Sequence, residues 1–211
     1  MIVAVGHADL TAPALELVQA ELRDHLERLS DGAAGLVRAG AGVPVAFGRA
    51  ARAAGRRLVV LLPTQRAVPA VLPEPDRSGA AELLMLAEEV RLLGFDPADR
   101  DARVSADERV VAAGRKVYAV WDGSPSDGAD ATAHLVAFAR SRGIPVEVVW
   151  PAGAARRARP ADTHATSATE ADTHATSAAE ADTHATSGAE TDTRPVAVSH
   201  APARAVKGGV R

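Results

Sequence analysis

The chain has 211 residues, of which 47% are hydrophobic and only 3% aromatic, so its core must be built from Ala, Val and Leu. Its 24 basic and 27 acidic residues give a net charge of −3, and this balance offers no reason to expect nucleic acid or an anionic membrane as partner. The absence of cysteine excludes disulfides, a thiolate nucleophile and a cysteine-ligated metal.

The first elements follow from simple patterns. Residues 2–5 form an apolar run that predicts a buried strand and is too short for a signal or membrane segment, so we expect a soluble, cytoplasmic protein. Thr11 is a predicted N-cap for a helix that ends near Leu29. Residues 35–38 predict a short strand, and residues 43–54 predict a helix that Gly55 closes.

The middle of the chain contains the strongest strand signal, residues 57–62. The prolines within residues 64–75 predict a long irregular loop. Ser78 then predicts the cap of a helix over residues 80–88, and residues 90–95 predict a strand. The spacing of Ser105 and Glu108 fits a capping box, which predicts a short helix over residues 106–113.

Residues 116–132 form the most informative stretch, because a β-branched strand, a polar turn and a helix entry follow one another directly. The strand covers residues 117–121, the helix residues 129–142, and a last strand residues 146–150. Strands and helices thus alternate along the chain, and parallel strands joined by helical crossovers are the economical solution. We predict an α/β fold with a three-layer, Rossmann-like, mostly parallel sheet over residues 1–152.

Residues 153–211 differ in character. The decapeptide Ala-Asp-Thr-His-Ala-Thr-Ser-x-x-Glu recurs in tandem, and the only large aliphatic residues of this segment are four valines. Such a composition cannot offset the entropy cost of ordering, so we expect a disordered low-complexity tail. Its repeated histidines, His164, His174 and His184, each lack a second ligand at helical spacing, so solvated repeats are favoured over a metal site.

Ligands of open α/β sheets bind at the carboxyl ends of the strands, where the strand order reverses. The residues predicted there are Gly6, His7, Asp9, Gly40, Gly42, Asp122, Gly123, Gly128 and Thr132. Each has a structural alternative: His7 a histidine satisfied by its neighbours, Asp9 an Asx turn or a helix-dipole partner, Thr132 a cap. Asp122 ends a central strand before a glycine and is the favoured functional residue.

The strand exit Gly6-His7-Ala8-Asp9-Leu10, with the later W-D-G strand end and the G-x-x-x-T-A loop, resembles the SLOG superfamily. That group includes the LOG phosphoribohydrolases and the DNA-uptake protein DprA. The run from V-W-D-G to A-R-x-R-G-I-P-V-x-V-V-W-P looks like small actinobacterial members. The resemblance covers about residues 1–152 and implies binding of a nucleotide, nucleoside or ribose-containing ligand.

Two departures from the family pattern bear on activity, and one is the loop of residues 38–45, which lacks the acidic residue that relatives carry after Gly42. Alignment of the LOG phosphate-binding stretch places Ala131 where a glycine is expected and Leu135 where the catalytic glutamate is expected, and Asp130 at the helix entry would repel phosphate. We therefore interpret the chain as a binding protein that is either non-catalytic or a diverged, weakly catalytic member. One alternative is an N-glycosidic-bond hydrolase or transferase that uses His7, Asp9 or Asp122 as acid or base, and a second is a scaffold that acts through its tail.

No sequence motif predicts a cofactor or a metal: no P-loop, no G-x-S-x-G, no H-E-x-x-H and no G-x-G-x-x-G after a strand is present. DNA binding is disfavoured because there is no basic stripe with interleaved aromatics. The expected partner is a small nucleotide-like molecule. A homo-oligomeric contact is also possible around one helix that is apolar on more than one face, through Leu83, Leu84, Met85, Leu86, Leu92 and Leu93.

Overall fold

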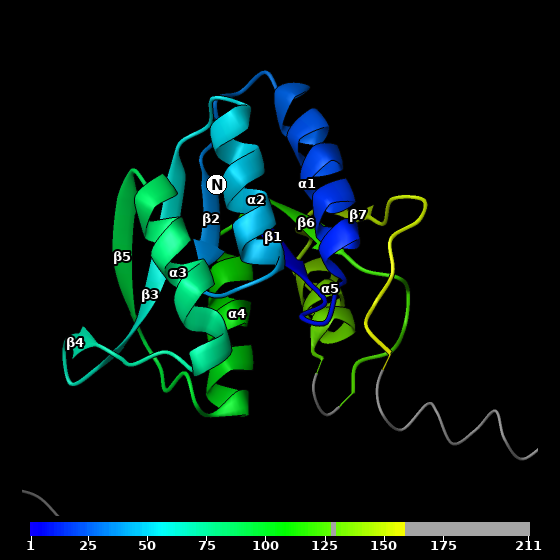
Figure 1. Cartoon of the computed structure of the whole chain (residues 1–211). Helices are drawn as coiled ribbons and strands as arrows, with labels where there is room; N and C mark the ends of the chain where they lie inside the picture. The colour runs from blue at the N-terminus through cyan, green and yellow to red at the C-terminus, as the bar shows by residue number, and fades with distance from the viewer. Residues whose placement is uncertain (128–129, 159–211) are drawn as a thin grey trace, which may run out of the picture. The chain divides into compact units, whose positions relative to one another are not determined.

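A computed structural model describes residues 1–127 and 130–158 (Figure 1). Within them the chain alternates strands and helices. The elements are β1 (Ile2–Gly6), α1 (Ala12–Glu27), β2 (Gly35–Arg38), α2 (Val43–Ala53), β3 (Leu58–Gln65), β4 (Val68–Pro69), α3 (Glu74–Leu86), β5 (Glu89–Gly94), α4 (Arg100–Ala112), β6 (Lys116–Val120), α5 (Thr132–Ser141) and β7 (Val146–Val149). None of these helices is long and apolar enough to cross a membrane.

The strands form one mostly parallel sheet. β1 pairs with β2 on one side and β6 on the other, β2 continues to β3 and then β5, and β6 continues to β7. Only β4 runs antiparallel, as a two-residue pairing at the end of β3. The chain therefore builds the sheet outward from β1 in one direction and then returns to its other side, so the strand order reverses between β1 and β6.

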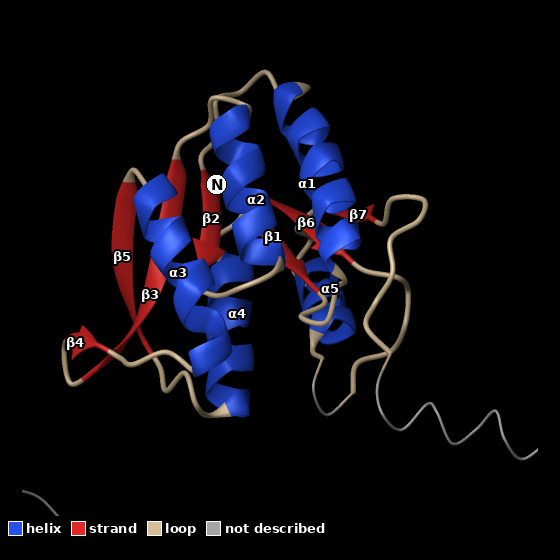
Figure 2. Cartoon of the chain, in the orientation of Figure 1, coloured by secondary structure: helices blue, strands red, loops and turns tan. Residues whose placement is uncertain are grey.

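Helices cover both faces of the sheet (Figure 2). Alternate residues of β1 point to opposite faces: Ile2 and Ala4 pack with α1, α2 and α3, whereas Val3 and Val5 pack with α4 and α5. Because both faces are buried at the centre of the sheet, β1 and β6 and the first half of β3 are apolar runs rather than alternating ones. The predicted three-layer, Rossmann-like α/β fold is confirmed.

Most predicted elements lie where the sequence places them. Thr11 caps α1 and accepts a hydrogen bond from the Ala14 backbone N–H at 3.3 Å. Gly55 follows α2 with a φ of 66°, in the left-handed region expected of a helix-ending glycine. The local signals of periodicity and capping are therefore sufficient for these elements.

The predicted irregular loop over residues 64–75 is wrong. β3 runs on to Gln65, and Pro69 lies in the short antiparallel strand β4, where its missing N–H is tolerated at an edge. α3 begins at Glu74 rather than after Ser78, because Pro73 stands at the N-cap and Pro75 in the first turn, where no N–H is needed. Prolines here start a helix instead of preventing one.

The predicted capping box at Ser105 is also wrong. α4 begins at Arg100, six residues before the predicted start, and the side chain of its N-cap Asp99 accepts a hydrogen bond from the Asp101 backbone N–H at 2.9 Å. Ser105 and Glu108 therefore lie inside the helix. Both Asp99 and Ser105 are residue types that cap helices, and the cap at Asp99 gives the longer helix.

Candidate functional site

The ends of β1 and β6 approach each other very closely at the point where the strand order reverses. A Cβ atom on Gly6 would lie 2.6 Å from the Cβ of Val120 and 2.7 Å from its carbonyl oxygen, so only glycine fits. The next residue, His7, donates its backbone N–H to the same Val120 carbonyl at 3.2 Å. This close approach directs the His7 side chain under the β6–α5 loop.

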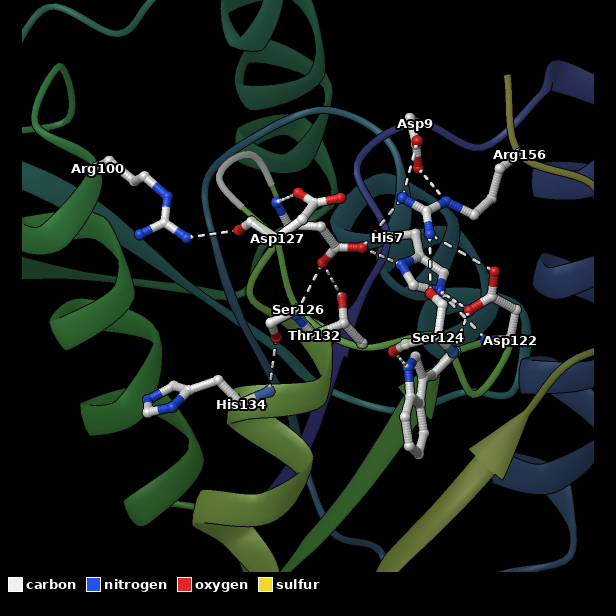
Figure 3. A network of polar contacts seen from close by, with 12 residues as sticks. His7, Asp9, Arg100, Asp122, Ser124, Ser126, Asp127, Thr132, His134 and Arg156 are labelled. Carbon is white, nitrogen blue, oxygen red and sulfur yellow. Dashed lines mark hydrogen bonds and ion pairs between the residues drawn. The ribbon is translucent and has the colours of Figure 1, made fainter. Parts of the chain in front are cut away.

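His7 is enclosed by two carboxylates (Figure 3). Its Nδ1 is hydrogen bonded to Oδ2 of Asp130, and its Nε2 lies 2.8 Å from Oδ1 of Asp122 and 3.2 Å from the Asp122 backbone N. The side chain is only 1% exposed. A carboxylate can only accept, so the Asp130 contact calls for a hydrogen on Nδ1, whereas Nε2 faces both the Asp122 carboxylate and the Asp122 backbone N–H, which donates to it.

The electrostatics of this arrangement favour the charged form of His7. Burial by itself would lower the pKa of His7, but the hydrogen bond and negative charge of Asp130, with a further hydrogen bond to Asp122, outweigh it and raise the pKa. Burial would raise the pKa of Asp122, but its hydrogen bonds with Ser124 and His7 hold that pKa well below the usual range of an aspartate. The three side chains therefore form one ionised cluster.

Asp130 stands at the N-terminus of α5. Its Oδ1 accepts the Thr132 backbone N–H at 2.7 Å and the Thr132 hydroxyl at 2.6 Å, while its Oδ2 faces His7. Burial would raise its pKa, but the hydrogen bonds from His7 and Thr132 lower it to about 2. A helix N-terminus favours a negative charge, and here the chain supplies that charge itself.

A second cation closes the cluster from outside. Arg156 binds both oxygens of Asp9, with Nε–Oδ1 at 2.9 Å and Nη2–Oδ2 at 3.0 Å. Its Nη1 also donates to the Ser124 hydroxyl at 2.9 Å, and its guanidinium lies 3.5 Å from Asp122 and 3.4 Å from Asp130. Two cations, His7 and Arg156, thus face three carboxylates, those of Asp9, Asp122 and Asp130.

Ligand atoms of His7, Asp9 and Asp130 lie within 4.8 Å of one another, a spacing that suits a metal ion. The guanidinium of Arg156 already contacts the carboxylates of Asp9 and Asp130. These residues would therefore hold a metal only after Arg156 had moved away.

A cavity of about 280 Å³ opens on the other side of His7 and Asp130. It lies at the carboxyl ends of β1 and β2, where the first turns of α2, α3, α4 and α5 converge. One part of its wall is apolar and is formed by Val5, Val43, Val104, Val110 and Leu135.

The rest of the cavity wall is polar and carries charges of both signs. Arg38 binds Asp107 through two nitrogens of one guanidinium edge, Nε–Oδ1 at 2.7 Å and Nη2–Oδ2 at 3.3 Å. Asp76, from α3, accepts the Ala41 backbone N–H at 3.1 Å and fixes the β2–α2 loop. Two further cations, Arg100 and Arg103, lie at the α4 side. The wall therefore offers donors and acceptors with little unbalanced charge.

The predicted site residues divide into distinct groups. Gly6, His7, Gly40 and Thr132 line this cavity, as does Asp130, which the sequence reading considered only as a phosphate-repelling residue. Asp9 and Asp122 lie behind His7, where they bind Arg156 and His7. Gly123 forms a turn with a φ of 90°, and Gly42 lines another cavity, of about 310 Å³, between α1, α2 and α3. Gly128 lies outside the described residues.

The structural alternatives to ligand contact account for several of these positions. His7 is satisfied inside the chain, though by carboxylates rather than by backbone. Thr132 lies in the first turn of α5 and donates its backbone N–H to Asp130, whose carboxylate thereby caps the helix. Trp121 packs at the rim and donates its indole N–H to the Ser124 carbonyl at 2.7 Å. Sequence reasoning missed Arg38, Asp76, Asp107 and Arg156; of these, only Arg38 ends a predicted strand, at residues 35–38.

No protein-family model matches the chain, and no curated protein matches it. Among solved structures, two of the molybdenum cofactor carrier protein from Chlamydomonas reinhardtii are similar, at 19% and 18% identity with a TM-score of 0.44 each. Both alignments cover 70% of this chain and 74% of the other. An uncharacterized protein from Agrobacterium tumefaciens C58 matches at 14% identity and a TM-score of 0.21, over 70% of this chain and 62% of the other.

Proposed function

We propose that this domain binds a nucleoside or another small ribose-containing molecule in the cavity beside His7 and does not convert it. The observation that carries the proposal is the cavity itself. It lies where ligands bind in open α/β sheets, at the carboxyl ends next to the reversal of strand order. Its volume of about 280 Å³ falls at the lower end of the range of ligand pockets, which begins near 300 Å³.

The two halves of the wall match the two halves of such a ligand. The apolar side chains of Val104, Val110 and Leu135 provide a surface for the face of a base. The paired Arg38 and Asp107, together with Asp76, provide donors and acceptors for sugar hydroxyls.

Asp130 argues for an uncharged ligand rather than a phosphorylated one. The N-terminus of α5 is where this type of fold would hold a phosphate. Asp130 already fills that position with a carboxylate whose oxygens are bound by Thr132 and His7. A phosphate there would be repelled and would find the Thr132 N–H already used.

The same contacts support the non-catalytic part of the proposal. His7, Asp9 and Asp122 are the acid or base candidates of the hydrolase alternative. Both ring nitrogens of His7 face carboxylates, both oxygens of Asp9 are bound by Arg156, and Asp122 binds His7 and the Ser124 backbone N–H. A general acid or base needs a free atom within reach of the substrate.

Calorimetric titration with a panel of nucleosides tests this proposal. We expect at least one nucleoside to bind the full chain and the Val104→Trp variant, whose indole fills the cavity, to bind it at least tenfold more weakly. Val45→Trp is the matched control, because Val45 lines the other cavity, between the helices on the opposite face. Failure of every nucleoside to bind, or equal losses in both variants, would overturn the proposal. Release of free base from a bound nucleoside would overturn its non-catalytic part.

A further inference from the structure

We propose that two copies of this chain associate through β5, so that their sheets join edge to edge. In the described part of the chain β5 pairs only with β3, through the register from Val59↔Glu89 to Thr64↔Gly94. The other side of β5 therefore presents its backbone N–H and C=O groups at the edge of the sheet, as Figure 1 shows for this outermost strand. Such an edge is a template for another strand.

The surface around this edge is unusually apolar. Of the eight large hydrophobic side chains that are exposed among the described residues, six belong to the β4, α3 and β5 segment between residues 68 and 92. Val90 and Leu92 of β5 are 44% and 54% exposed, and Met85, at the end of α3, is 88% exposed. Natural edge strands usually carry charges or prolines that discourage pairing, but Val90 and Leu92 leave one face of β5 apolar.

The charged residues on the other face of β5 indicate that the partner at this edge is a second copy of the same strand. Glu89 and Arg91 lie on the same face and pair with each other, Nε–Oε1 at 2.6 Å. An antiparallel pairing of two β5 strands, with its two-fold axis at Val90, places Glu89 of each copy opposite Arg91 of the other. On the opposite face it places Val90 against Val90 and Leu92 against Glu88, so an aspartate at position 92 would meet a like charge. The edge is thus self-complementary, as a two-fold interface requires.

The proposed contact uses fewer residues than the sequence predicted. Leu83 is fully buried in the core, and Leu86 and Leu93 pack against the two core clusters. Only Leu84, Met85 and Leu92 of that predicted set are exposed enough to meet a partner. The contact therefore belongs to the sheet edge and the adjoining end of α3, and not to a whole helix face.

Light scattering coupled to size exclusion tests the proposal with the full chain. We expect wild type to have twice the chain mass. Leu92→Asp should be monomeric with an unchanged far-ultraviolet spectrum, because Leu92 is half exposed. Val148→Asp is the matched control, since Val148 is 43% exposed on β7 at the opposite edge, and it should remain dimeric.

Charge reversal then tests the pairing itself. Glu89→Arg and Arg91→Glu should each weaken the dimer at least tenfold, because each places like charges opposite one another. The double reversal, Glu89→Arg with Arg91→Glu, should restore it. A wild-type chain that is monomeric at high micromolar concentration, a dimer that Val148→Asp dissociates and Leu92→Asp does not, or a double reversal that fails to restore the dimer would overturn the proposal.

Discussion

Arg156 and Asp9 are joined by two hydrogen bonds, of 2.9 and 3.0 Å, across 147 positions of sequence. The segment of residues 153–158, which we call the strap, follows β7 and returns to the β1–α1 loop. Thr11 donates its backbone N–H to the Ala155 carbonyl at 3.1 Å, and Arg157 donates its backbone N–H to the Asp9 carbonyl at 2.7 Å. The strap therefore fixes the loop from which His7 projects.

Replacement of Arg156 by methionine should destabilise the domain by about 2–3 kcal/mol, because Asp9 loses its partner and the cluster loses one of two cations. Arg157→Met is the control, since Arg157 donates through its side chain only to the Leu10 carbonyl, at 3.2 Å. Urea unfolding of both variants measures the difference. Equal losses would mean that the cluster contributes no more than an ordinary surface contact.

Truncation separates the strap from the repeats that follow it. A chain that ends after residue 158 should unfold at the temperature of the full chain, whereas one that ends after residue 152 should unfold at a clearly lower temperature, because Arg156 and the backbone pairing of the strap are lost. Scanning calorimetry measures both. If the two truncated chains unfold at the same temperature, the strap does not stabilise the domain.

The elements of this fold were predictable where their signals are local. The strand, turn and helix of residues 116–132 follow from β-branched residues, Asp122-Gly123 and a polar loop, and the structure has β6 and α5 in those places. The predicted starts of α3 and α4 were wrong for different reasons: prolines begin α3 instead of preventing it, and Asp99 rather than Ser105 caps α4. Local propensity cannot make the choice between Asp99 and Ser105.

The site was predictable only as an edge of the sheet. Gly6 and His7 stand out because they end the first strand. The partner of Asp9, by contrast, lies in a segment of residues 153–211 that contains no large aliphatic residue except four valines, and nothing in the sequence marks Arg156 among the other arginines. Long-range ion pairs have no periodicity, so they become visible only when the topology brings their residues together.

Stability should depend on pH on both sides of a maximum. The pKa of His7 is raised above its ordinary 6.5, so its contribution is complete below pH 6.5 and is lost as the pH rises through the folded-state pKa. The pKa of Asp130 is lowered from 3.8 to about 2, so its contribution is complete above pH 3.8 and is lost as the pH falls toward 2. The maximum is expected between these limits.

The loss of stability on the alkaline side of that maximum should come from His7. It should disappear in His7→Gln and persist in His134→Gln, because His134 is 49% exposed and pairs with Glu108 on the surface. Denaturant unfolding from pH 4 to 9 measures the profile. Should His7→Gln prove too unstable to unfold cooperatively, a nuclear magnetic resonance titration of the wild-type imidazole gives the same answer, and a His7 pKa below 6.5 would contradict it.

The close contact between β1 and β6 predicts that Gly6→Ala destabilises the domain by about 1–3 kcal/mol, because the new methyl group would overlap Val120. Gly94→Ala is the matched control at the end of β5. A Cβ atom there meets nothing within 4 Å, so its effect should stay within about 0.5 kcal/mol. Chemical denaturation distinguishes the two, and a tolerated Gly6→Ala would show that β1 and β6 can move apart freely.

If Asp130 is what excludes phosphate, removal of its charge should change ligand preference. Asp130→Asn keeps an oxygen for the Thr132 N–H but leaves the N-terminus of α5 without an anion. The affinity for a nucleoside monophosphate, relative to its nucleoside, should then rise by about 5- to 30-fold, which corresponds to about 1–2 kcal/mol. Titration of both ligands against wild type and variant measures the ratio.

Asp122→Asn is the control for that experiment. It also removes a carboxylate partner of His7, at 2.8 Å, but Asp122 follows β6 and does not line the cavity. The ratio of the two affinities should therefore stay at its wild-type value in Asp122→Asn. A similar rise in both variants would assign the effect to the loss of a His7 partner, and no rise in either would show that Asp130 does not set the preference. Only a rise confined to Asp130→Asn supports a carboxylate that occupies the phosphate position at α5.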